Sequence, residues 1–235
     1  MFHSKLNNIF DKLAAGKRIR LLAVGSSNTQ RRQPGMHWLD YLELGLKYRF
    51  GKGAVIVINS GVGGDTSRGV LERFDTDVKL FRPDITILTV GGNDAAPKMD
   101  ISPEEYKDNI TDICKRILDM RSIPVLQTYY SCDLDKVEIN NLVEARQFPQ
   151  YMNIMREVAS RMDLPLIDHL KRWEPLRLND LEKYRKLMND PFHVNSIGNM
   201  LIGVDLLRKF DLDISPFENY CREGVEYQAI LDKLQ

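Results

Sequence analysis

Two pairs of polar residues have the types and spacing needed for acyl transfer by a serine. Ser26 and Ser27 are adjacent and follow the apolar run at 21–24, and Asp190 precedes His193 by three residues. A serine hydroxyl is a weak nucleophile that needs a neighbouring base, and a neutral imidazole oriented by a carboxylate is such a base. One short loop can carry both the carboxylate and the ring. These residues predict nucleophilic attack by a serine oxygen, provided that the fold brings them together.

Each of these groups also has a simpler interpretation. Serines after a strand commonly satisfy turn or helix-start N–H groups, and a single Asp-x-x-His is more often structural than catalytic. Gly63 and Gly64 are typical of a tight turn, and they lack the GxGxxG and GxxxxGK[ST] spacings of phosphate-binding loops. Asn93 and Asp94 could form a plain turn. The catalytic interpretation therefore requires that all of these segments meet at one site.

Short apolar runs alternate along the chain with longer segments of helical periodicity. The runs predict five strands, at 19–24, 54–58, 84–90, 123–129 and 164–167. The other segments predict helices at 35–49, 67–80, 103–120, 147–161, 196–210 and near 225–234. Strands that are apolar on both faces and are followed by helices indicate a parallel sheet between two helical layers. The expected fold class is α/β, a three-layer α/β/α sandwich.

The most polar and glycine-rich segments lie directly after predicted strands or ahead of the last long helix. They are at 25–30, 59–67, 91–96 and 189–198, and the stretch between the fifth strand and the last of them is expected to be irregular. In an open parallel sheet, loops after the strands meet at the carboxyl edge, where ligands bind. The sequence therefore predicts one site built from these four loops.

The four loops resemble the conserved blocks of the SGNH hydrolases, also called the GDSL family. Ser27 matches the serine of the first block and Gly64 the glycine of the second. Asn93 matches the asparagine of the third, and His193 the histidine of the fifth, with Asp190 three residues earlier. The blocks occur in the family's order and span most of the chain, so the match is much more specific than any single block.

The resemblance implies a flavodoxin-like five-stranded sheet of order 2-1-3-4-5 and a site that cleaves esters. Ser27 would be the nucleophile, His193 its base, and Asp190 the group that orients the ring. The backbone N–H groups of Ser27 and Gly64 and the side-chain amide of Asn93 would bind the oxyanion. No His, Cys or Asp cluster has the spacing of a metal site, so neither a metal nor a cofactor is expected.

One position departs from the family pattern. The first block usually reads Gly-Asp-Ser, and its middle residue here is Ser26. Serine also hydrogen-bonds within turns, so the turn is expected to form. The change leaves two candidates for the nucleophile, Ser27 by the resemblance and Ser26 as the alternative. The G-x-S-x-G elbow of the α/β-hydrolases is absent, which argues against that fold.

Length and composition indicate one globular domain. Residues 1–235 are expected to form a single unit, with an N-terminal helix at about 1–15 and a C-terminal helical extension at about 211–235. The 33 basic and 33 acidic residues balance, so no nucleic-acid partner is expected. No apolar run approaches the ~20 residues of a membrane span, and the N-terminus lacks the apolar core of a signal peptide. The oligomeric state stays open.

Other reactive side chains are expected to be uninvolved in the chemistry. Cys114, Cys132 and Cys221 are far apart and form no CxxC pair, which indicates unpaired thiols in a cytoplasmic protein. Cys132 falls in a predicted loop and could be exposed, but a catalytic cysteine is not expected. Asp168 and His169 are a rival acid–base couple at a strand tip, for which we expect a structural or pocket-edge role.

The expected function is cleavage of a small ester through a Ser27 acyl-enzyme, with an acetylated carbohydrate among the candidate substrates. The alternative class is a catalytically silent relative that binds a small carbohydrate or anion in the same cleft. Transfer of the acyl group to an alcohol would use the same residues. The stretch 131–149 is either a solvent-exposed loop or short helix, or a flap that shapes the pocket. Arg31 and Arg32 are either substrate-binding or ordinary surface charges.

Overall fold

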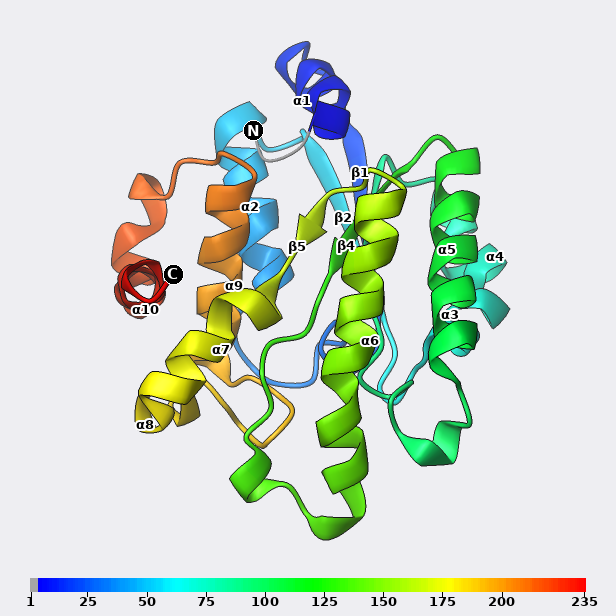
Figure 1. Ribbon diagram of the computed structural model, residues 1–235. Helices are drawn as coiled ribbons and strands as arrows, with labels where there is room; N and C mark the ends of the chain where they lie inside the picture. Colours follow the sequence, from blue (N-terminus) through cyan, green and yellow to red (C-terminus); the bar gives the residue numbers. More distant parts are fainter. Residues whose placement is uncertain (1–3) are drawn as a thin grey trace.

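The computed structural model describes residues 4–235 and contains a five-stranded parallel sheet between two layers of helices (Figure 1). The strand order is β2-β1-β3-β4-β5, and every neighbouring pair is parallel. The strands are β1 (Ile19–Gly25), β2 (Val55–Gly61), β3 (Ile85–Thr89), β4 (Ile123–Gln127) and β5 (Leu166–Ile167). The predicted fold class and strand order are confirmed.

The side chains of β1 alternate between two hydrophobic cores. Leu21 and Ala23 belong to the core on one face of the sheet, whereas Leu22 and Val24 belong to the core on the other. All four are fully buried, which explains why the strand reads as an unbroken apolar run. Because a slip of one residue would exchange the two faces, this burial sets the register of β1 and the place where its following loop begins.

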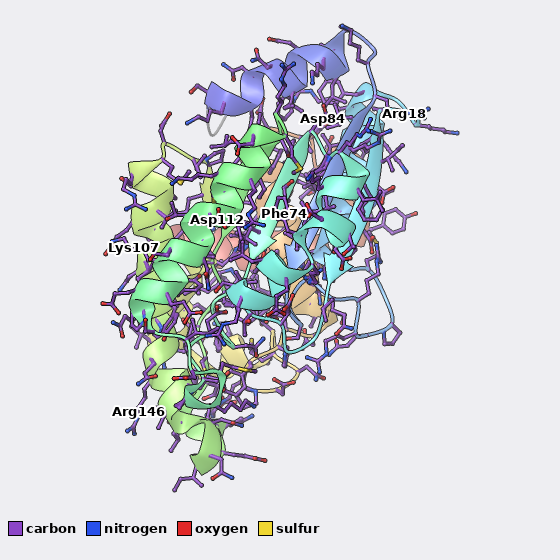
Figure 2. The ribbon with its side chains drawn as sticks, turned by 90° about the vertical axis from the view of Figure 1, so that its right-hand side faces the viewer. Arg18, Phe74, Asp84, Lys107, Asp112 and Arg146 are labelled. Carbon is purple, nitrogen blue, oxygen red and sulfur yellow. The ribbon has the colours of Figure 1, made fainter. Side chains whose placement is uncertain are left out.

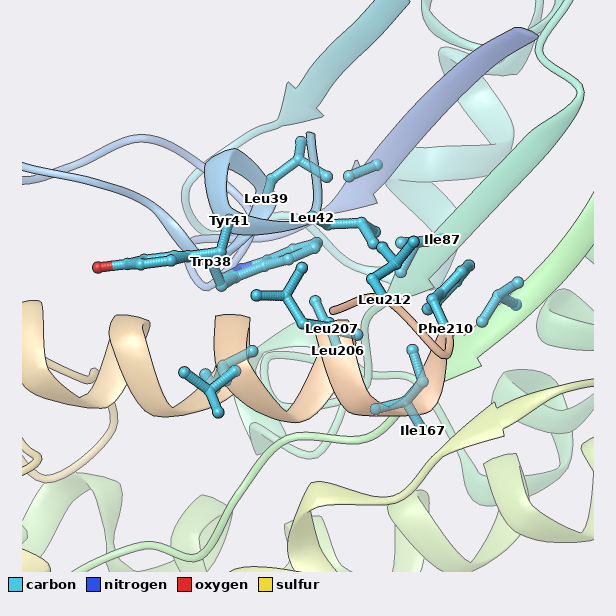
Figure 3. Close-up of a cluster of buried hydrophobic side chains, with 14 of the residues drawn as sticks. Trp38, Leu39, Tyr41, Leu42, Ile87, Ile167, Leu206, Leu207, Phe210 and Leu212 are labelled. Atoms are coloured by element: carbon cyan, nitrogen blue, oxygen red, sulfur yellow. The ribbon is translucent and has the colours of Figure 1, made fainter. Parts of the chain in front are cut away.

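One face of the sheet is covered by α2 (Trp38–Phe50) and α9 (Ser196–Lys209). Figure 3 shows Trp38 of α2 and Leu207 of α9 in the cluster that fills the space between these helices and the sheet. Outside them, α10 (Arg222–Lys233) packs against α9.

The N-terminal segment lies at the amino ends of the strands, opposite the predicted site. It contains a 3-10 turn, η1 (Ser4–Leu6), followed by α1 (Asn7–Ala14), and Figure 1 shows α1 at this end of the molecule. Leu6, Phe10 and Leu13 are buried in the core shared with α2 and α9. The helix predicted at about 1–15 is therefore observed over this stretch, and its first three residues lie outside the described part.

The other face is covered by α3 (Ser67–Glu72), α4 (Phe74–Asp77), α5 (Pro103–Asp119) and α6 (Leu142–Arg161). Figure 2 views this side, with Lys107 and Asp112 on the outer surface of α5. The prediction of a single helix at 67–80 is wrong. The helix is interrupted at Arg73, between α3 and α4, and the segment ends in a 3-10 turn, η2 (Lys79–Phe81). The Arg73 guanidinium binds the carboxylates of Asp65 and Asp77 at this break.

The stretch after β5 is helical rather than irregular, which corrects the prediction. It contains α7 (His169–Asn179) and α8 (Leu181–Arg185). The carboxylates of Asp168 and Asp180 cap these two helices by accepting backbone N–H groups. Pro175 lies inside α7 and obscured its helical pattern in the sequence, because proline usually ends a helix.

The chain between β4 and β5 extends beyond the carboxyl edge of the sheet. It forms η4 (Leu134–Lys136) and η5 (Ile139–Asn141), and α6 then begins at Leu142 instead of 147. Figure 1 shows these turns and the first part of α6 beyond the strands. Two more 3-10 turns are η3 (Pro97–Met99) and η6 (Ser215–Tyr220). Within residues 4–235, none of the helices has the length and apolar character required to cross a bilayer.

Candidate active site

Ser27, His193 and Asp190 form a continuous chain of hydrogen bonds at the carboxyl edge of the sheet. Ser27 follows the end of β1, and its Oγ lies 2.8 Å from His193 Nε2, although the two residues are 166 positions apart. On the other side of the ring, His193 Nδ1 lies 2.8 Å from both carboxylate oxygens of Asp190. The arrangement allows the imidazole to take the serine proton while the carboxylate holds the opposite ring nitrogen.

The loop before α9 holds its own carboxylate in place. Asp190 Oδ1 accepts the backbone N–H groups of Phe192 and His193 at 2.9 and 3.0 Å. Burial alone would raise the pKa of Asp190, but these N–H groups and the neighbouring imidazole outweigh it and hold the pKa below its ordinary value. Asn195 caps α9 by accepting the N–H groups of Ile197 and Gly198. Asp190 therefore stays ionised beside the ring.

The environment of His193 favours its neutral form. Burial lowers the pKa of the imidazole below 6.5, the positive charge of Arg32 acts in the same direction, and Asp190 opposes both. Only a neutral ring can accept a proton from Ser27. Arg32, one of the two arginines left open by the sequence, thus lies within electrostatic reach of His193, whereas Arg31 forms an ion pair with Asp40.

Ser26 occupies a different environment from Ser27. It is 1% exposed, and its Oγ lies 2.6 Å from Tyr129 Oη, in the loop after β4. Tyr129 Oη in turn donates to the carbonyl oxygen of Thr89, which also accepts the backbone N–H of Ser26. These bonds close a ring that ties the turn after β1 to the ends of β3 and β4. The geometry favours Ser27 over Ser26 as the nucleophile.

We expect Tyr129→Phe and Ser26→Ala each to lower kcat for an acetyl ester by about tenfold, the effect of losing one buried hydrogen bond that orients the turn. The double variant should lose no more than either single variant, because both changes break the same link. Initial-rate kinetics measure the three values.

The matched control is Tyr106→Phe, which removes another buried hydroxyl, bonded at 3.1 Å to the carbonyl of Val90. It should lower the melting temperature but leave kcat unchanged, since Tyr106 does not contact the turn. Additive losses in Tyr129→Phe and Ser26→Ala would show that the two hydroxyls do not position the turn together.

Two backbone donors near Ser27 have no acceptor within residues 4–235. They are the N–H groups of Ser27 and Gly64, for which no hydrogen bond to a described protein atom exists. Gly64 has φ +81°, which explains the glycine, because other residues rarely adopt this conformation. A Cβ added there would meet no atom within 4 Å, so crowding within the protein is not the reason. Ser27 and Gly64 line the same cavity.

Asn93 and Asp94 connect the loop after β3 to the loop after β2. Asn93 Nδ2 donates to the carbonyl of Asp65 at 2.7 Å, which leaves its second amide proton available. Asp94 is fully buried, and its Oδ1 accepts the N–H of Ser67 at 2.8 Å. Asn93 lies at the site, as predicted from the sequence. Asp94 joins the loop after β3 to the start of α3 through its hydrogen bond with Ser67.

The four loops line one open cavity of about 420 Å³. This volume is within the range of about 300–1,000 Å³ that is typical of small-molecule sites. The residues that line this cavity include Ser27, Gly64, Asn93 and His193. The stretch 131–149 lines it as well, through Ser131, Cys132, Asn141, Glu144 and Phe148. That stretch therefore shapes the cavity, which was one of its two interpretations.

Tyr130 is a site residue that the sequence did not single out. Its Oη accepts the N–H of Val194 at 2.9 Å and donates to Asn28 Oδ1 at 2.5 Å. It therefore joins the loop of Ser27 to the loop of His193. The only signal in the sequence was a pair of aromatic hydroxyls, at 129 and 130, directly after a predicted strand.

The remaining candidates are structural. His169 is fully buried and does not line the cavity that Ser27 lines, and burial lowers its pKa to about 4. Cys132 is buried rather than exposed, which corrects that expectation, and burial raises the pKa of its thiol to about 12. The residues described by the structure include no group of three or more His, Cys, Asp or Glu side chains that could hold a metal.

The fold and the loops at its carboxyl edge define the class of the SGNH hydrolases. Residues 23–201 match the model of the GDSL-like Lipase/Acylhydrolase family, and the chain belongs to this family. The resemblance seen in the blocks of the sequence is therefore confirmed, and the chain is an SGNH-type hydrolase.

The individual relatives share less than 30% of their residues with this chain. An uncharacterized lipoprotein of Bacillus subtilis (strain 168) is 27% identical over 179 residues, which cover 65% of this chain and 71% of the relative. An acetylxylan esterase from Geobacillus stearothermophilus superimposes with a TM-score of 0.69 at 21% identity, over 83% of this chain and 95% of the other. An alpha/beta hydrolase enzyme from the metagenome of Lake Arreo, Spain, has a TM-score of 0.67 at 23% identity, over 81% and 94%. These structural matches show the shared fold.

Proposed function

We propose that this chain is a serine esterase that cleaves a small ester through an acyl-enzyme on Ser27. The observation that carries the proposal is the pair of contacts on His193, with Ser27 Oγ at 2.8 Å on one nitrogen and the carboxylate of Asp190 at 2.8 Å on the other. A nucleophile, a base and an orienting group in this order are what serine-dependent acyl transfer requires.

The proposed reaction has two halves that use the same groups. Ser27 Oγ attacks the ester carbonyl carbon and gives its proton to His193 Nε2. The N–H groups of Ser27 and Gly64 and the free amide proton of Asn93 stabilise the oxyanion. His193 then protonates the leaving alcohol as the C–O bond breaks. In the second half, water attacks the acyl carbon and gives a proton to His193. His193 then returns this proton to Ser27 Oγ as the acyl–oxygen bond breaks, and the carboxylic acid leaves.

An acetyl ester of a carbohydrate is our proposed substrate class. Two of the structural neighbours are acetylxylan esterases, and catalytic mutants of one of them replace a serine and a histidine by alanine. The cavity of about 420 Å³ offers room for an alcohol much larger than the acetyl group. The polar side chains along its wall favour an alcohol that carries hydroxyl groups.

Covalent labelling tests the proposal directly. A fluorophosphonate should react with the folded protein in proportion to time, and mass spectrometry of the digest should place the adduct on Ser27 rather than Ser26. Hydrolysis of p-nitrophenyl acetate should be lost as the label is incorporated. An unlabelled protein with no activity on acetyl esters of graded size would instead support the silent small-molecule binder.

Product analysis separates hydrolysis from acyl transfer. With p-nitrophenyl acetate and a simple alcohol present, a hydrolase should release acetate, whereas an acyltransferase should form the new ester from the same acyl-enzyme. We expect acetate as the main product, because the site cavity is open enough for water to reach Ser27. A dominant ester product would assign the transferase activity.

The pH dependence of kcat/KM should follow the ionisation of His193 in the free protein. Activity should rise with pH as the ring loses its proton, and it should reach its plateau at a lower pH than an ordinary histidine would give, because the pKa of His193 is lowered. Arg32→Gln removes a charge that lowers this pKa, so its midpoint should move to higher pH. Asp190→Asn removes a charge that raises the pKa, so its midpoint should move to lower pH, with a plateau reduced by about 10⁴-fold.

Rates of p-nitrophenyl acetate hydrolysis across the acid range measure these midpoints. Opposite shifts in the two variants are the expected result. Identical profiles in wild type and both variants would mean that another group acts as the base.

We also propose a cytoplasmic location. Cys114, Cys132 and Cys221 are all free and buried, as expected in a reducing compartment. Fractionation of cells that express the natural gene tests this, and recovery with the membrane fraction, as for a lipoprotein, would contradict it.

A further inference from the structure

One wall of the cavity carries charged and polar side chains that have no partner in the protein. Lys98 lies in η3 after β3, Asn141 ends η5, and Glu144 lies in the first turn of α6. Within residues 4–235, none of the three side chains makes a hydrogen bond or an ion pair. By contrast, Asp133 and Glu174 nearby are both paired with arginines. The three side chains are therefore free to bind a ligand in the cavity that they line.

Glu144 is the most unusual member of the set. It is half-buried, and burial raises the pKa of its carboxyl group, while the charge of Lys98 works in the opposite direction. A carboxylate in the first turn of α6 is favoured by the helix dipole, which explains the residue type at this place. A half-buried carboxylate that lines a cavity without a protein donor accepts hydrogen bonds from water in the free protein, and hydroxyl groups of a ligand can replace that water.

The charges of the wall select among possible ligands. Lys98 and Glu144 line the same cavity and attract each other, but they form no direct ion pair, so a ligand that contacts both must satisfy an ammonium group and a carboxylate. A cationic alcohol would meet Lys98 and also Arg32, which lines the same cavity. An anionic one would meet Glu144. A hydrocarbon chain would strip water from a carboxylate and an ammonium group and leave both unpaired.

A neutral polyol satisfies every group on this wall. A hydroxyl has one proton to donate and two lone pairs to accept with, so neighbouring hydroxyls can donate to Glu144 and accept from Lys98 and from the amide of Asn141. Phe148 and Phe192 line the cavity beside these groups and offer apolar surface for the C–H faces of a ring. The wall lies in the same cavity as Ser27, on loops other than those that carry the nucleophile and base.

We propose that Lys98, Asn141 and Glu144 form a subsite that binds free hydroxyl groups of the leaving alcohol and so selects a partly acetylated carbohydrate or polyol over an apolar ester. This inference rests on the function proposed above and assigns the specificity of the same site. Glu144 and Lys98 act on binding of the alcohol, whereas the chemistry at the acyl carbon belongs to Ser27 and His193.

The test compares two acetyl esters of similar ring size. One is a mono-O-acetylated methyl xylopyranoside, which keeps two free hydroxyls, and the other is cyclohexyl acetate, which has none. The measured quantity is the ratio of kcat/KM for the sugar ester to kcat/KM for cyclohexyl acetate. We expect this ratio to be well above one for the wild type and to fall about tenfold or more in Glu144→Gln and in Lys98→Met, the size expected for loss of a charge-assisted hydrogen bond.

Matched controls lie on the same segment outside the cavity. Glu138→Gln and Lys136→Met change exposed residues that do not line it, and both should keep the wild-type ratio. Because each ratio is taken within one variant, a partly misfolded sample lowers both rates and leaves the ratio unaffected. A wild-type ratio near or below one, or an unchanged ratio in Glu144→Gln and Lys98→Met, overturns the subsite. No hydrolysis of either ester by the wild type overturns the esterase function itself.

Discussion

Ser27→Ala should abolish ester hydrolysis, with kcat for p-nitrophenyl acetate falling by a factor on the order of 10⁴ to 10⁶, to the level of the residual binding contribution. The physical reason is that Ser27 Oγ is the hydroxyl in contact with the base, at 2.8 Å from His193 Nε2. The alanine variant should fold normally, because Ser27 is only half-buried and its Oγ makes this one hydrogen bond. Steady-state rates and fluorophosphonate labelling measure the loss.

Ser26→Ala is the matched control for this prediction, since it removes the same atom from the adjacent residue. It should still be labelled on Ser27, and its rate should fall only by the roughly tenfold expected for a loosened turn. Labelling of the Ser27→Ala variant, or retention of its activity, would mean that Ser26 is the nucleophile. The turn would then have to rearrange, because Ser26 Oγ is buried against Tyr129 Oη.

His193→Ala is the second variant with a large expected effect, a loss of similar size to that of Ser27→Ala. The hydroxyl of Ser27 would have no base within reach, and Asp190 would be left without the ring that it orients. The Ser27→Ala/His193→Ala double variant should be no worse than either single one, because the two residues act as a unit. The same rate assay checks all three proteins.

Asn195→Ala provides the structural control for His193→Ala. It removes the cap of α9 two residues away, so it should cost about 1 kcal/mol of stability but keep most of the activity. A thermal melt gives the stability change. If His193→Ala retained activity near that of the wild type, the proposed role of the imidazole would be wrong, and the hydrogen bond to Ser27 would be structural.

Local sequence patterns were sufficient to predict most of the scaffold. The apolar runs at 19–24 and 84–90 became β1 and β3, because strands buried on both faces must be apolar throughout. The helix predicted at 196–210 is observed as α9, Ser196–Lys209. The failures at α7 and at the break after α3 arose where tertiary contacts outweigh propensity, as at Pro175 and Arg73.

The sequence predicted which residues form the site but not which serine contacts the base. The order of the blocks identified Ser27, Gly64, Asn93, Asp190 and His193. The structure brings four of them to one cavity and places Asp190 against the opposite ring nitrogen of His193. The sequence left Ser26 and Ser27 as competing nucleophiles, because adjacent serines have the same local pattern. Two long-range contacts separate them: Ser27 Oγ meets His193 across 166 positions of sequence, whereas Ser26 Oγ meets Tyr129 across 103. Likewise, no local pattern could reveal that Glu144 faces the cavity without a partner.

The sequence by itself determined the fold class, the order of the blocks and the residue types available for chemistry, since these follow from hydrophobic periodicity and from loops placed after buried strands. The tertiary structure decided which hydroxyl meets the imidazole, which tyrosine holds the nucleophile turn, and which charges line the cavity. The physical reason is that hydrogen bonds and ion pairs act over a few ångströms between residues more than 100 positions apart, as at Ser27 and His193, so their partners are set only when the sheet and its loops have assembled.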